Sequence, residues 1–103
     1  MVFEELSCFT KRVLELLDDS DYVELQFALA SNPGLGKVIR GSGGLRKVRW
    51  ARSGQGKSGG VRVIYYWWVA DSLITLADIY SKNEKENISA REIEALRKQI
   101  EGE

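Results

Sequence analysis

The 103-residue chain has no histidine and a single cysteine, Cys8. A histidine-pair ribonuclease and a Ser-His-Asp triad both need an imidazole, and a zinc site of cysteine and histidine needs several such ligands, so all three are excluded. One cysteine cannot form a disulfide within the chain, which fits the reducing cytoplasm. We expect a cytoplasmic protein whose chemistry uses no metal ion and no cofactor.

Long hydrophobic runs are absent as well. The longest apolar run, residues 63–70, has the length of a strand, whereas a transmembrane helix needs about 18 apolar residues. The N-terminal sequence MVFEELSCF does not place a basic segment before an apolar one, as a secretory signal would. We therefore expect one globular domain over residues 1–103 and no membrane partner.

Acidic residues are missing from the centre of the chain. Residues 25–70 contain no Asp or Glu but eight of the 15 basic residues, so this centre carries +8 and the two ends together carry −8. Such an asymmetry indicates a surface that binds a polyanion. The alternative is that the acidic ends neutralise the centre through ion pairs within the chain. The eight basic residues are Lys37, Arg40, Arg46, Lys47, Arg49, Arg52, Lys57 and Arg62.

The hydrophobic pattern predicts an α+β domain in the order β-α-α-β-β-β-α, with helices packed on an antiparallel sheet. Asp21 with Glu24, and Ser89 with Glu92, have the spacing of capping boxes and are expected to open the second and third helices. Residues 34–44 are expected to form an irregular, glycine-rich connection. The expected strands are residues 2–6, 45–51, 61–69 and 73–80, and the expected helices follow Ser7, Asp21 and Ser89.

Two of the expected strands carry the candidate site. In the sequence LRKVRWA, alternation places Lys47 and Arg49 on one face and Val48 and Trp50 on the other. If Arg62 on the next strand faces the same side as the first pair, three cations converge on a patch the size of a phosphate. Arginine offers paired donors to phosphate oxygens, and a lysine with cationic neighbours can act as a base.

Arg62 lies inside an otherwise apolar and aromatic strand. A buried guanidinium without an anion is costly, and no acidic residue is near it in sequence. Either a substrate phosphate supplies the negative charge, or Asp71, Asp78 or a carboxylate on a helix pairs with it.

Aromatic residues and a polar loop surround this arginine. Rings such as Tyr66 and Tyr80 can stack on the unpaired bases of single-stranded RNA, although we expect most of the aromatic residues here to pack in the core. The loop ARSGQGKSGG is either a hairpin end or a phosphate clamp that carries Arg52 and Lys57.

The sequences GGLRKVRWARSGQGKSGGVRVIYYW and IYSKNEKENIS together resemble the RelE superfamily of bacterial toxins, in particular its HigB-like branch. The resemblance implies a ribosome-dependent endoribonuclease that cuts messenger RNA in the ribosomal A site. It also implies a cognate antitoxin with a helix-turn-helix domain, through which alone the complex would contact operator DNA.

In that family the ribose 2′-hydroxyl attacks the adjacent phosphate, which leaves a cyclic phosphate and a free 5′-hydroxyl. The resemblance assigns catalytic roles to Lys47, Arg49, Arg62 and Lys82. With it we assign RNA binding to Arg46, Arg52, Lys57, Tyr66 and Tyr80.

The chain departs from its relatives at two positions. Asn83 stands where some relatives have a further arginine, and Ile88 stands where they have a tyrosine base. Lys47, Lys82 or Tyr80 would then have to act as the base, or the ribosome and substrate orientation would supply most of the acceleration. Two alternatives to an active nuclease stay open: a catalytically inactive RNA- or ribosome-binding module, and a domain that serves chiefly as a protein-interaction partner.

Overall fold

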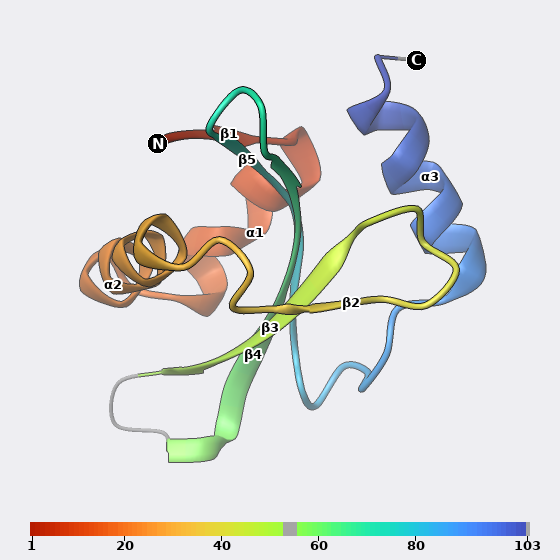
Figure 1. Ribbon diagram of the computed structural model, residues 1–103. Coiled ribbons are helices and arrows are strands. Elements are labelled where there is room, and N and C mark those ends of the chain that lie inside the picture. Colours follow the sequence, from red (N-terminus) through yellow and green to blue (C-terminus); the bar gives the residue numbers. More distant parts are fainter. Residues whose placement is uncertain (53–55, 103) are drawn as a thin grey trace.

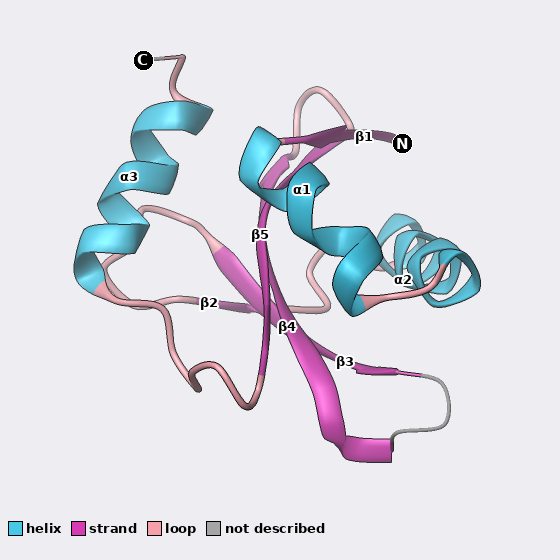
Figure 2. Cartoon of the chain, turned by 180° about the vertical axis from the view of Figure 1, so that it is seen from behind, coloured by secondary structure: helices cyan, strands magenta, loops and turns pink. Residues whose placement is uncertain are grey.

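One five-stranded sheet with helices on both faces forms the protein (Figures 1 and 2). The computed structural model describes residues 1–52 and 56–102, and the side chains of residues 53–59 lie outside the described part. None of the helices in these residues is long and apolar enough to cross a membrane. The elements are β1 (Val2–Glu5), α1 (Ser7–Leu16), α2 (Asp19–Ser31), β2 (Lys37–Val38), β3 (Arg46–Arg52), β4 (Gly56–Trp68), β5 (Leu73–Ser81) and α3 (Ala90–Ile100).

The strand order is β1-β5-β4-β3-β2, and the predicted α+β fold is confirmed. Two details differ from the expectation. The first strand joins β5 in parallel, so the sheet is mixed, because α1 and α2 carry the chain away before the antiparallel strands begin. The connection of residues 34–44 contains the short strand β2, which pairs with β3. Its two residues are both exposed, and therefore they leave no hydrophobic pattern in the sequence.

The first residues of α2 and α3 show which of the predicted N-cap residues are used. Asp18 caps α2 by accepting a hydrogen bond from the backbone nitrogen of Asp21, so the prediction that Asp21 is the cap was wrong by three residues. Several residues of the run DDSD are good caps, and the earliest one prevails because the helix can then extend by nearly one turn. The capping box of Ser89 and Glu92 at α3 is confirmed, with both reciprocal bonds present.

Two hydrophobic cores lie on opposite faces of the sheet. Phe9 of α1 and Leu25 of α2 pack on one face against Val63, while Leu96 of α3 packs on the other face together with Ile64. The strand β4 contributes fully buried side chains to both cores, which confirms its prediction as a central strand. A strand anchored on both faces is a rigid support for any charged side chain that it also carries.

Tyr65 of β4 fixes the segment that leads into β2. Its hydroxyl donates to the carbonyl of Pro33 at 2.7 Å and accepts from the backbone nitrogen of Gly36 at 2.8 Å. The backbone of Gly36 passes so close that a Cβ there would lie 2.9 Å from the ring of Tyr65 and from the carbonyl oxygen of Lys47. The position of β2 beside β3 therefore depends on this tyrosine and this glycine.

We expect Tyr65→Phe to lower the free energy of unfolding by about 1–3 kcal/mol, because the mutation leaves a buried backbone N–H and a carbonyl without their partner. Urea denaturation of the variant and the parent protein measures this difference. The matched control is Tyr66→Phe, since the hydroxyl of Tyr66 has no hydrogen-bond partner among the described residues. Equal stability of the two variants would contradict the role given to Tyr65.

Candidate functional site

Three cations of adjacent strands gather on the α3 side of the sheet. Arg49 of β3 lies directly opposite Arg62 of β4, and Lys47 lies opposite Ile64, which packs in the α3 core. Residues directly opposite in an antiparallel pair share a face, so all three charges point the same way. The structure thus brings together the residues that the alternating pattern singled out.

The negative partner of Arg62 is Glu86, in the segment that joins β5 to α3. The Arg62 Nη2 donates to both carboxylate oxygens of Glu86, at 3.1 and 2.9 Å, and Arg49 Nη2 donates to Oε2 at 3.2 Å. The sequence had suggested Asp71, Asp78 or a carboxylate on a helix, and none of these forms the pair.

The side chains of Arg62 and Glu86 differ in their exposure to solvent. The Arg62 side chain is 6% exposed, whereas the Glu86 side chain is 46% exposed. The hydrogen bond from Arg62 lowers the pKa of Glu86 below its ordinary value, and the charges of Arg62 and Arg49 act in the same direction. Glu86 is therefore an anion at neutral pH, held by one buried and one exposed guanidinium.

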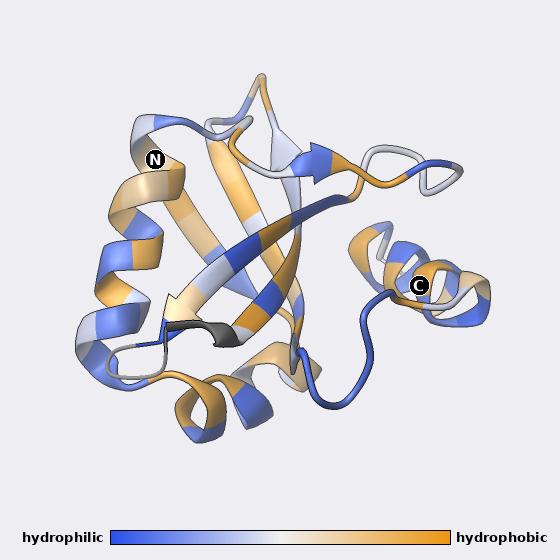
Figure 3. Cartoon of the chain, turned by 90° about the horizontal axis from the view of Figure 1, so that it is seen from below, coloured by the Kyte–Doolittle hydropathy of each residue, from blue (hydrophilic) through white to orange (hydrophobic). Residues whose placement is uncertain are grey.

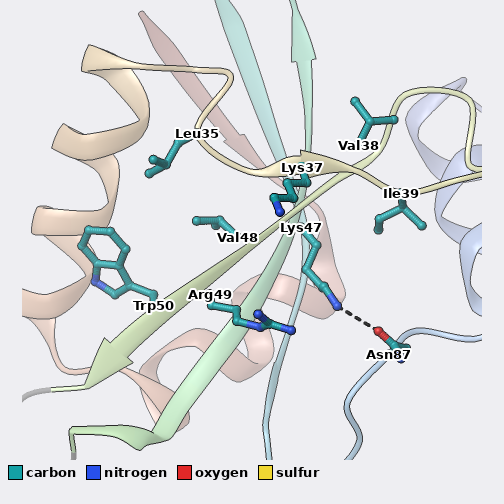
Figure 4. A pocket seen from close by; sticks show the side chains of 9 residues that line it. All are labelled: Leu35, Lys37, Val38, Ile39, Lys47, Val48, Arg49, Trp50 and Asn87. Atoms are coloured by element: carbon teal, nitrogen blue, oxygen red, sulfur yellow. Dashed lines mark hydrogen bonds between the residues drawn. The ribbon is translucent and has the colours of Figure 1, made fainter.

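Lys47 extends from β3 towards the same segment. Its Nζ donates to Oδ1 of Asn87 at 2.9 Å (Figure 4). Burial lowers the pKa of Lys47 below 10.5, and the charges of Arg49 and Arg62 lower it further, while Glu86 opposes them. The neutral amine is thus more accessible than in an ordinary lysine, which is the property that a base requires.

A groove of about 620 Å³ lies beside these cations, where β2 ends and β3 continues (Figure 4). Trp50, Val48 and Leu35 line one part of it, and three cations line the rest together with two further apolar side chains and an amide. A second cavity of about 390 Å³ shares Arg49 and Trp50 with the groove and reaches Arg62. The alternating pattern had placed Trp50 on the face opposite Lys47 and Arg49. Trp50 packs against the core on that face, and it also lines the groove. The groove residues are Leu35, Lys37, Val38, Ile39, Lys47, Val48, Arg49, Trp50 and Asn87.

Other predicted cations lie outside the cluster. Arg46 donates to the carbonyls of Gly34 and Gly36, at 3.4 and 2.7 Å, so its guanidinium holds the segment before β2. Arg52 ends β3, and the side chain of Lys57 lies outside the described residues. Lys82 is exposed and directly follows β5.

The two tyrosines predicted to bind RNA are not open to the cluster. Tyr80 is fully buried, its hydroxyl donates to the carbonyl of Glu86 at 3.3 Å, and burial raises the pKa of Tyr80 to about 12. Tyr66 lies four residues from Arg62 along β4, about 13 Å at the usual rise of a strand. Its ring packs edge-on against Trp68 and lines a different cavity, next to Arg97.

The site consists of arginine, lysine and amide groups around one carboxylate. Among the described residues no group of three or more His, Cys, Asp or Glu side chains is placed to hold a metal ion. Sequence reasoning missed Glu86 and Asn87, although both lie in the hydrophilic run of residues 82–87, seen in blue before α3 in Figure 3. The arrangement can bind an anion with two or more oxygens and can exchange a proton through Lys47.

Residues 34–101 match the family model of the RelE toxin of the RelE / RelB toxin–antitoxin system. This stretch covers about two thirds of the chain and includes the three cations, Glu86 and Asn87. The chain belongs to the RelE toxin family. RelE toxins are ribonucleases that are each paired with an antitoxin, so the protein is a toxin of a toxin–antitoxin system and has a cognate antitoxin as its partner. Only α1, α2 and β1 lie outside the part that matches the RelE family.

Proposed function

We propose that this RelE toxin, from the HigB-like branch, is a ribosome-dependent endoribonuclease that cuts messenger RNA in the ribosomal A site. The observation that carries the proposal is the carboxylate of Glu86 held by Arg62 and Arg49. Two guanidiniums that bind a carboxylate with three hydrogen bonds offer the donor pattern that a phosphodiester also takes.

The reaction suits the groups that are present. The ribose 2′-oxygen attacks the adjacent phosphorus, its proton passes to a base, and the 5′-oxygen of the next nucleotide leaves with a proton from an acid. A 2′,3′-cyclic phosphate and a 5′-hydroxyl result. Arg62 and Arg49 would stabilise the negative charge that grows on the phosphate oxygens in the transition state.

Lys47 is the best candidate for the base. It lies beside the two arginines, and burial lowers its pKa below the ordinary value, which favours the neutral amine that a base needs. Tyr80 is a poor candidate, because its hydroxyl is buried and already donates to the backbone. Lys82, exposed just beyond β5, is left as the candidate for the acid or for a further phosphate contact.

The groove beside β3 gives the RNA a path to this cluster. It combines Trp50, which offers an aromatic surface, with Lys37, Lys47 and Arg49. Aromatic rings inside a positive groove are typical of proteins that bind single-stranded nucleic acid. Arg52 and Lys57, on the hairpin that follows, would extend the positive path.

The cognate antitoxin would carry a helix-turn-helix domain, and operator DNA would be bound through it alone. With messenger RNA and the ribosome as targets, the site of action is the cytoplasm. The alternative function is an inactive RNA- or ribosome-binding module of the same fold, which would use the same cations without cutting.

Induced expression in a bacterium, followed by mapping of messenger RNA 5′-ends, tests the proposal. We expect growth arrest and new 5′-hydroxyl ends within codons, because the cleavage leaves that oxygen free. These ends should be missing when purified toxin and messenger RNA are incubated without ribosomes. Normal growth with intact transcripts would contradict the nuclease and favour the binding module.

A further inference from the structure

The segment between β5 and α3 holds Glu86 in a defined place. The carbonyl of Glu86 accepts from Tyr80, and the next side chain, Asn87, accepts from Lys47. Ile88 is buried in the α3 core, and Lys85 forms an ion pair with Glu92 of α3. These anchors surround Glu86 on both sides, so its carboxylate meets the arginines as a consequence of the fold.

The ion pair is asymmetric. Arg62 is buried on a central strand whose neighbouring residues pack in both cores, so its backbone position is fixed. Glu86 belongs to a connection, and nearly half of its side chain is in contact with solvent. A competing anion would therefore displace the carboxylate and leave the guanidinium in place.

Arg62 also retains donor capacity. Its Nε is buried and has no hydrogen-bond partner among the described residues, while Glu86 is bound through Nη2 alone. An arginine grips a phosphate best with two nitrogens in parallel. The carboxylate of Glu86 therefore leaves one donor of the Arg62 guanidinium unused. An anion that also binds Nε would be held more strongly and could replace the carboxylate.

We propose that Glu86 is an internal competitor for the substrate phosphate and thereby determines which RNA the toxin can use. The inference builds on the proposed function, since it takes a phosphodiester as the anion that displaces Glu86. In the free protein the two arginines are occupied, and RNA binds only after the carboxylate has moved away.

This competition discriminates between two forms of the same substrate. When a protein is competent to bind only part of the time, its apparent dissociation constant rises in proportion. A strand held in place by the ribosome has a high effective concentration at the site and overcomes this loss, whereas RNA free in solution does not. Glu86 is therefore a specificity-determining residue that favours ribosome-bound messenger RNA.

The test compares Glu86→Gln with the parent protein in binding a short single-stranded RNA whose 2′-hydroxyls are methylated. We expect binding to become about tenfold tighter, as it would if the arginines of the parent protein are free in about one molecule in ten. The control is Glu84→Gln, which removes the same charge from the same segment but affects a carboxylate paired with Arg12. That variant should bind like the parent.

Glu86→Gln binding no tighter than Glu84→Gln would overturn the competitor role, and so would RNA that fails to bind any of the three proteins. This result can be separated from a failure of the proposed function. Tighter binding by Glu86→Gln without cleavage on ribosomes would support the competitor and refute the nuclease. Cleavage on ribosomes, together with RNA binding that Glu86→Gln leaves unchanged, would support the nuclease and refute the competitor.

Discussion

Replacing Arg62 with alanine is expected to reduce ribosome-dependent cleavage about 100- to 1,000-fold, the usual effect of losing one donor to a developing oxyanion. The residue is buried in the central strand and aims its donors at the place where we expect the phosphate. Arg62→Lys should lose much of the activity as well, because an ammonium keeps the charge but not the paired donors. Quantifying 5′-hydroxyl ends on programmed ribosomes gives the rates.

Folding must be checked beside this result, because alanine at position 62 leaves a space in a strand that carries both cores. Circular dichroism and thermal unfolding of each purified variant serve this purpose. Arg97→Ala is a suitable control, since this arginine lies on α3 and pairs with Glu101 at the surface. An Arg62→Ala protein that folds and still arrests growth fully would contradict the assignment.

Lys47→Ala is expected to slow cleavage about 100- to 10,000-fold, the range for losing a general base. The assignment of Lys47 as the base also predicts how the cleavage rate depends on pH. A base works in its neutral form, so the rate of the parent toxin should rise with pH and level off near the pKa of Lys47, which lies below 10.5. The alanine variant should lose this rise, whereas an acid role for Lys47 would make the parent rate fall over the same range.

Rates of a single turnover on stalled ribosomes, measured over the pH range in which ribosomes stay intact, provide the comparison. Lys11→Ala, on α1 outside the site, is the matched lysine control. If Lys47→Ala keeps the parent rate and pH profile, another group is the base and Lys82 becomes the first residue to examine.

Local signals in the sequence were enough to predict much of the fold. The β-branched and aromatic run that forms β4, and the capping box of Ser89 and Glu92, each carry their information within a few residues. The alternation that brings Lys47 and Arg49 to one face is also local. Such features need no knowledge of distant contacts.

The features that were missed depend on distance along the chain. Glu86 meets Arg62 across 24 residues, and no pattern within either segment shows that the connection before α3 folds back over β3 and β4. β2 has only two residues, and it exists because Tyr65 holds the preceding segment from another strand. Trp50 contacts both the core and the groove, because β2 pairs only with the first residues of β3 and leaves the rest of that strand edge uncovered. This arrangement is visible only in the assembled sheet.

The direct opposition of Arg49 and Arg62 has a consequence for the resting protein. Like charges opposite each other on neighbouring strands destabilise a sheet. The fold carries this repulsion permanently, and Glu86 acts as its resident counter-ion. A polyanion that takes over this position adds its own favourable contacts and binds only the folded state. The folded toxin is therefore expected to be most stable when its substrate is bound. It is expected to be least stable when the Glu86 carboxylate has moved away and no other anion has taken its place.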